Sequence, residues 1–79
     1  MKEQQIQTKR IKQLEAEGYY VLKLVKTNKN GIPDLIAIKE GSVLFSEIKT
    51  SKGKLSEIQK YRMKELESYG FKTEIYNGE

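Results

Sequence analysis

The stretch DLIAIKEGSVLFSEIK, residues 34–49, decides the fold because it predicts two strands joined by a tight turn. Residues 34–38 form a near-continuous apolar run, which is typical of a strand that is buried on both faces. Residues 43–49 are a second β-rich segment, and Glu40-Gly41 before them is expected to be a two-residue turn. A turn of this length pairs residues whose numbers sum to 81, which fixes the register of the hairpin.

This register places two acidic side chains directly opposite each other. Ile36 faces Phe45, a sensible apolar pair, and Asp34 then faces Glu47, with Lys49 two residues further along the same face. Like charges ~5 Å apart repel by roughly 3 kcal/mol at an effective dielectric constant of ~20. A raised pKa on one acid, the nearby lysine or a divalent cation can compensate this repulsion. The alternative is a different turn, which leaves both acids exposed and without a role.

The elements outside the hairpin complete one mixed α/β domain over residues 1–79. Gly18 and Gly70 stand where glycine commonly ends a helix. The further expected elements are a helix over 2–17, a strand over 19–25, a polar loop over 26–31, a helix over 55–69 and a last strand over 71–76. The expected order is therefore α-β-β-β-α-β, with the helices packed on a single mixed sheet.

The composition narrows the chemistry that this domain can perform. Cysteine and histidine are both absent, which excludes thiolate and imidazole catalysis and leaves carboxylates, lysines and hydroxyl groups. The commonest chemistry that remains is water activated by a metal that carboxylates hold. The net charge of +4 suits a phosphate backbone as the partner.

The sequence also indicates where the protein works. The apolar runs are far shorter than a membrane span, and the N-terminus MKEQQIQTKR does not resemble a signal peptide. We therefore expect a cytoplasmic protein without a membrane partner, in the cytoplasm of the host cell if the chain is viral. A core of this size is marginal, so a metal, a ligand or a second copy is expected to add stability.

Two polar residues share helical stripes with apolar side chains, and each has two interpretations. Glu3 lies within the stripe of Ile6 and Leu14, either as a further acidic ligand or as a solvated residue of the first turn. Gln59 lies on the apolar stripe of the second helix, where it either meets the substrate or closes a capping box with Ser56.

Basic residues gather in the two loops that adjoin the acidic pair. Lys26 and Lys29 fall in the first of these loops, and Lys52 and Lys54 follow directly on residues 47–49, where a bound backbone would pass. The tyrosines, by contrast, are expected to pack the small core; they are Tyr19, Tyr20, Tyr61, Tyr69 and Tyr76.

These residues resemble a known nuclease signature. The run Gly31-Ile32-Pro33-Asp34, followed by Glu47-Ile48-Lys49, looks like the motif of the PD-(D/E)XK nucleases. The further run Lys54-Leu55-Ser56-x-x-Gln59, ending near Gly70-Phe71, is similar to the VRR-NUC branch of that superfamily. The resemblance covers nearly the whole chain and implies a restriction endonuclease-like core, whose element order agrees with the one expected above.

The resemblance also implies roles for individual residues. Asp34 and Glu47 would bind Mg2+, with Mn2+ as a substitute, and the main-chain carbonyl of Ile48 would be a further ligand. Lys49 would orient or help to deprotonate the attacking water, so that hydrolysis leaves 5′-phosphate and 3′-hydroxyl ends. Two residues match further positions of the family. Glu3 matches the acidic residue that many members carry on the first helix, and Gln59 matches the glutamine near the active site.

Stand-alone members of the family look like small dimeric enzymes that cut branched DNA. The implied function is therefore a structure-selective, metal-dependent DNA endonuclease acting at four-way (Holliday) junctions, as a homodimer and without a nucleotide cofactor. The alternatives are a nuclease of the same fold for flaps, single strands or duplex ends, a non-catalytic DNA-binding module, and a component of a larger nuclease.

Overall fold

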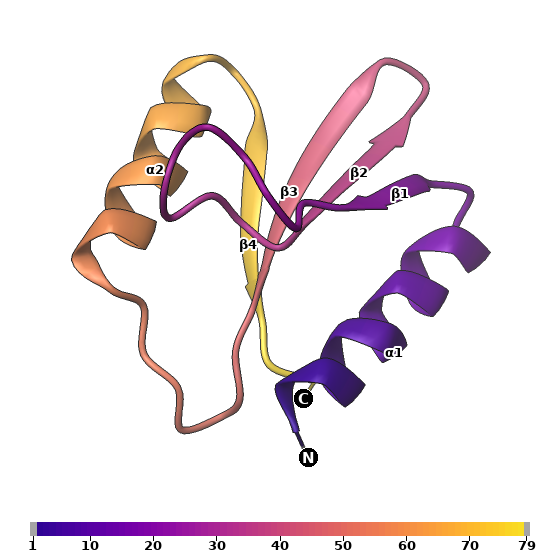
Figure 1. Cartoon of the computed structure of the whole chain (residues 1–79). Coiled ribbons are helices and arrows are strands. Elements are labelled where there is room, and N and C mark those ends of the chain that lie inside the picture. The colour runs from indigo at the N-terminus through magenta and orange to yellow at the C-terminus, as the bar shows by residue number, and fades with distance from the viewer. Residues whose placement is uncertain (1, 79) are drawn as a thin grey trace.

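The computed structural model describes residues 2–78 and has the expected order α-β-β-β-α-β (Figure 1). Each element lies within about two residues of its expected bounds. The elements are α1 (Glu3–Ala16), β1 (Tyr20–Lys23), β2 (Leu35–Lys39), β3 (Ser42–Ile48), α2 (Glu57–Ser68) and β4 (Lys72–Tyr76). Within this part of the chain, neither helix is long and apolar enough to cross a membrane.

The four strands form one mixed sheet in the order β1-β2-β3-β4. The first three strands are antiparallel neighbours, whereas β4 returns through α2 and pairs parallel to β3. Figure 1 shows α1 and α2 on opposite sides of this sheet. Strands β1 and β4 are therefore the two edges, and the Asp34–Lys49 hairpin lies in the middle of the molecule.

The turn of the hairpin confirms the register that the sequence predicts. Glu40 and Gly41 both have positive φ, 50° and 79°, as a two-residue turn with the twist of the flanking strands requires. Leu35 pairs with Ser46 and Ile36 with Phe45, so the residue numbers of each pair sum to 81.

The main core cluster lies between α1 and one face of the sheet, and it corrects one expectation for β2. Ile6 packs against Leu35 and Ile48 on this face. Ile36 and Ile38 point to the other face and are only half-buried, so β2 is fully buried on one side and not on both. The reason is that α2 packs against β4 and leaves the β2 side of that face partly open.

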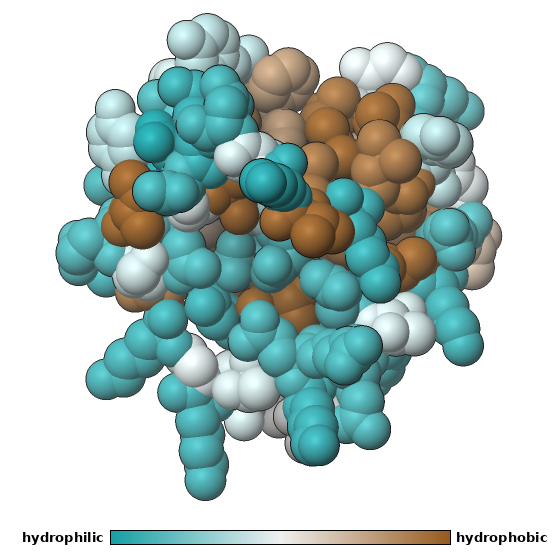
Figure 2. All heavy atoms as spheres, in the orientation of Figure 1, coloured by the Kyte–Doolittle hydropathy of each residue, from teal (hydrophilic) through white to brown (hydrophobic). Residues whose placement is uncertain are grey.

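The expectation that the tyrosines pack the core is wrong for three of them. Tyr61 and Tyr69, in α2 and at its C-cap, are exposed, and Tyr20 on the edge strand β1 is 65% exposed. Strand β1 is also shorter than the expected range of 19–25, since it ends at Lys23. The outer β1 side therefore keeps an apolar surface, and Figure 2 shows hydrophobic side chains gathered over β1 and the β2–β3 hairpin.

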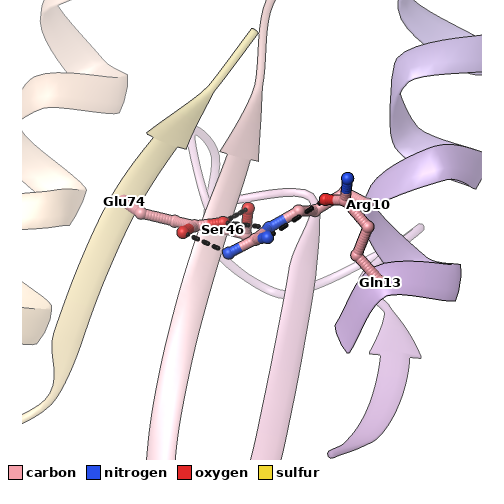
Figure 3. A network of polar contacts seen from close by, with 4 residues as sticks. All are labelled: Arg10, Gln13, Ser46 and Glu74. Atoms are coloured by element: carbon pink, nitrogen blue, oxygen red, sulfur yellow. Dashed lines mark hydrogen bonds and ion pairs between the residues drawn. The ribbon is translucent and has the colours of Figure 1, made fainter. Parts of the chain in front are cut away.

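A polar network ties α1 to β4 across the core face (Figure 3). The Arg10 guanidinium donates through Nε and Nη2 to the two carboxylate oxygens of Glu74, at 2.8 and 2.7 Å. The Ser46 hydroxyl on β3 donates to the same carboxylate at 2.5 Å, and Arg10 Nη1 donates to Gln13 Oε1 at 3.2 Å. The two ends of the chain are thus joined by a bidentate ion pair.

Candidate active site

Asp34 lies immediately before β2, where it is held from two sides. Its carbonyl oxygen accepts a hydrogen bond from the Leu24 N–H at 2.8 Å. Its carboxylate oxygen Oδ2 accepts one from the Ile48 N–H, also at 2.8 Å. The carboxylate therefore takes the place of a main-chain partner at the end of β3, because the ladder between β2 and β3 ends at the pair of Leu35 and Ser46.

Glu47 lies beside Asp34, as the hairpin register predicts, and is only 2% exposed. Its pKa is raised from 4.5 to about 7. Burial is the largest cause, followed by the negative charge of Asp34, while the positive charge of Lys49 acts in the opposite direction. A side-chain hydrogen bond with Asp34 raises the pKa of Glu47 further, so burial and the neighbouring acid both disfavour the charged form of Glu47.

Lys49 and Gln59 both approach the same oxygen of Glu47. The Lys49 ammonium Nζ lies 3.7 Å from Glu47 Oε2, and Gln59 Nε2 donates to this oxygen at 3.3 Å. Gln59 also closes the predicted capping box: its Oε1 accepts from the Ser56 N–H, and its own N–H donates to Ser56 Oγ. The capping-box interpretation of Gln59 is therefore confirmed, and the same side chain also contacts the acidic pair.

The loop before Asp34 is fastened to α2 by contacts that the sequence does not reveal. Gly31 has φ +79°, and a Cβ there would lie 2.9 Å from Ile58 Cγ1 and 3.0 Å from the Ile58 carbonyl group. The Arg62 guanidinium donates through Nε to the Asn30 carbonyl at 2.8 Å. These contacts place Asp34 and Gln59 relative to each other, because the first follows this loop and the second belongs to α2.

The other predicted site residues lie at the periphery. Glu3 is exposed in the first turn of α1 and acts on the centre only through its charge, the smallest of the causes that raise the pKa of Glu47. The four loop lysines are exposed as well: Lys26 and Lys29 between β1 and β2, Lys52 and Lys54 between β3 and α2. The first of these loops lines a surface cavity of about 380 Å³.

The donor atoms at the acidic pair suit a hard divalent cation. Over residues 2–78, no three acidic side chains come together, so Asp34 and Glu47 would be the two carboxylate ligands without Glu3. The N–H and C=O of one strand residue point to the same neighbour, so the Ile48 carbonyl lies on the side of Asp34. Mg2+ is usually held by one or two carboxylates and keeps several waters, which matches this set.

Comparison with known proteins agrees with this geometry. The family model described as the VRR-NUC domain matches residues 1–79. No significant match was found among curated protein sequences or among solved structures. The motif residues Asp34, Glu47 and Lys49 converge at the end of a mixed sheet with two helices, and the family match extends from the first residue to the last. The chain belongs to the VRR-NUC domain family and is a nuclease-type domain.

Proposed function

We propose that this domain is a metal-dependent endonuclease for branched DNA, with the four-way junction as its foremost substrate. The observation that carries the proposal is the pair of Asp34 and buried Glu47, two neighbouring carboxylates whose mutual repulsion a bound divalent cation would relieve. Lys49 and Gln59 at the same carboxylate complete a centre that is suited to phosphodiester hydrolysis without histidine or cysteine.

Mg2+, with Mn2+ as a substitute, is the proposed cofactor, held by Asp34, Glu47 and the Ile48 carbonyl. When bound, it would polarise the scissile phosphate and lower the pKa of a coordinated water. Gln59 fixes the Glu47 carboxylate through its amide, and Lys49 presents an ammonium group that can donate to a phosphate oxygen or orient the water. The short distances from Glu47 to Lys49 and Gln59 support this proposal, because a metal site works best when its surrounding groups are already close together.

The basic loops support recognition of DNA shape over sequence. Lys26 and Lys29 precede Asp34, and Lys52 and Lys54 follow Lys49, so positive charge stands on both sides of the acidic pair along the chain. Exposed lysines contact phosphate oxygens, which carry no sequence information. Sequence readout in the major groove usually needs an inserted helix or ribbon, and both helices within residues 2–78 pack on the sheet.

Cleavage of labelled substrates tests this proposal. We expect a four-way junction to be cut by symmetric nicks with Mn2+, at least about tenfold faster than a linear duplex of matched sequence, and not with EDTA. Faster cleavage of a flap or a single strand would show that this DNA, and not the junction, is the preferred substrate. Binding to the junction without cleavage in any divalent metal would identify a non-catalytic DNA-binding module instead.

We also propose that the domain acts as a homodimer whose contact is the exposed side of β1. Tyr20 and Leu22, 65% and 43% exposed, share this side with the half-buried Ile36 and Ile38, and β1 is an unshared edge of the sheet. A stable interface needs about 800 Å² per partner, about one-seventh of the 5587 Å² surface of this chain. Twofold pairing of β1 with its copy would place both acidic pairs on the same side of a continuous sheet.

Sedimentation velocity with the Leu22→Lys variant tests the dimer. We expect the wild-type chain to sediment as a dimer at micromolar concentration and the variant as a monomer, because the lysine would bury a charge at the interface. Ile75→Lys is the matched control, since Ile75 is 54% exposed on the opposite edge strand β4 and should leave the mass unchanged. A monomeric wild-type protein in the presence of Mn2+ would reject the proposed interface.

A further inference from the structure

The segment that carries Glu47 and Lys49 is paired with only one strand, β4. On the side of β2, the strand ladder ends at Ser46, and only the Asp34 carboxylate reaches further, to the Ile48 N–H. On the other side, Glu47 pairs with Ile75, Ile48 pairs with Tyr76, and the Lys49 N–H donates to the Tyr76 carbonyl at 3.0 Å. The position of this segment therefore depends on where β4 lies.

Strand β4 is poorly suited to fix its own position. It is an edge strand that pairs with β3 only, and its pairing is parallel, which is slightly less stable per residue than antiparallel pairing. None of its five residues is fully buried. Helix α2 packs against one face of β4, and an anchor on the other face would fix its register against β3.

Arg10 supplies such an anchor from the far side of the sheet. It binds the Glu74 carboxylate with two hydrogen bonds (Figure 3). Its Cζ also lies 4.7 Å from the centroid of the Tyr76 ring. Glu74 and Tyr76 are the β4 partners of Ser46 and Ile48, the two residues that flank Glu47. Arg10 thus holds β4 at the two points between which Glu47 lies.

We propose that Arg10 is a positioning residue for the nuclease centre: through Glu74 and Tyr76 it fixes the β3–β4 register that keeps Glu47 and Lys49 beside Asp34. The guanidinium touches neither acid of the centre, so its effect passes through the sheet. The side chains of Arg10 and Glu74 are 16% and 25% exposed, and such a largely buried ion pair is weak support for stability compared with apolar packing. Its two-point geometry instead specifies one register, which a single apolar contact would not do.

The test compares Arg10→Met and Arg10→Lys with Ile11→Val, a matched control on the same helix that removes one methyl group from a half-buried side chain. All three are measured at a temperature where urea titration shows them to be fully folded. We expect Arg10→Met to lower kcat about tenfold or more with KM nearly unchanged, and to weaken Mn2+ binding by calorimetry without DNA. Arg10→Lys should retain part of the wild-type kcat and Mn2+ affinity, and Ile11→Val should change neither quantity.

A second readout separates this inference, which rests on the proposed function, from that function itself. In Arg10→Met and Arg10→Lys, amide hydrogen exchange at Ile48 and Lys49 should accelerate selectively relative to the amides of β1 and β2. Unchanged kcat, Mn2+ affinity and local exchange in a folded Arg10 variant would overturn the positioning role. If the wild-type protein neither cleaves DNA nor binds Mn2+, the proposed function fails, and the exchange pattern alone still decides the role of Arg10.

Discussion

Replacing Glu47 by glutamine is expected to lower the rate of DNA cleavage by about a thousandfold or more, while the fold is retained. The variant keeps the shape of the side chain and an oxygen for Gln59 but removes the charge that would hold a divalent cation with Asp34. Single-turnover cleavage with saturating Mn2+ measures the effect. Glu15→Gln, which removes an exposed carboxylate from α1, is the control and should cleave at the wild-type rate.

The same substitution should remove the pH dependence of stability that Glu47 imposes. The folded-state pKa of Glu47 is raised to about 7 from 4.5, so its contribution to metal-free stability is complete below pH 4.5 and is lost as the pH rises through 7. One pKa unit corresponds to about 1.4 kcal/mol, so the loss amounts to about 3 kcal/mol by pH 8. Without metal, Glu47→Gln should match the wild type near pH 4.5 and exceed it above pH 7 in urea titrations. Equal stability at both pH values would contradict the buried acidic pair.

Gly31→Ala is expected to destabilise the protein by about 3 kcal/mol, a large part of the stability of a chain this small. A φ of +79° is strained for alanine, and the alanine Cβ would also lie 2.9–3.0 Å from the side chain and backbone of Ile58. The loop before Asp34 would have to separate from α2, so we expect cleavage to fall as well.

Gly41 is the matched control for this substitution. Gly41 also has φ +79°, but nothing lies within 4 Å of a Cβ placed there, so Gly41→Ala should cost only about 1 kcal/mol of backbone strain. The difference between the two variants in urea titrations isolates the contact with Ile58. Equal losses in the free energy of unfolding would show that stability does not depend on this close approach of the loop to α2.

The fold and the acidic pair could be predicted because both depend on local patterns. Glu40-Gly41 fixes the hairpin turn, and the strand alternation then places Asp34 against Glu47 without further information. Gln59 was ambiguous in sequence because a capping box and a contact with the centre use the same spacing, and the structure combines them.

The remaining features depend on distances along the chain that no local pattern encodes. Arg10 meets Glu74 across 64 residues, and Arg62 meets the Asn30 carbonyl across 32. Neither arginine belongs to a local sequence motif that would indicate its partner. The exposure of Tyr20 and Tyr61 was missed for a related reason: helical or strand periodicity says which residues share a side, but not whether another element covers that side.

The unequal lengths of these connections suggest an order of assembly. The hydrogen bond from Ile48 to Asp34 spans 14 residues and closes around a two-residue turn, so the hairpin with its two acids is expected to form early. The bond between Arg10 and Glu74 spans 64 residues and joins the two ends of the chain, so it is expected to close last. An incomplete or still emerging chain would then contain the acids without the register that aligns them. Competence to cut DNA would arrive with the final step of folding, and partly folded molecules would be harmless to the nucleic acid around them.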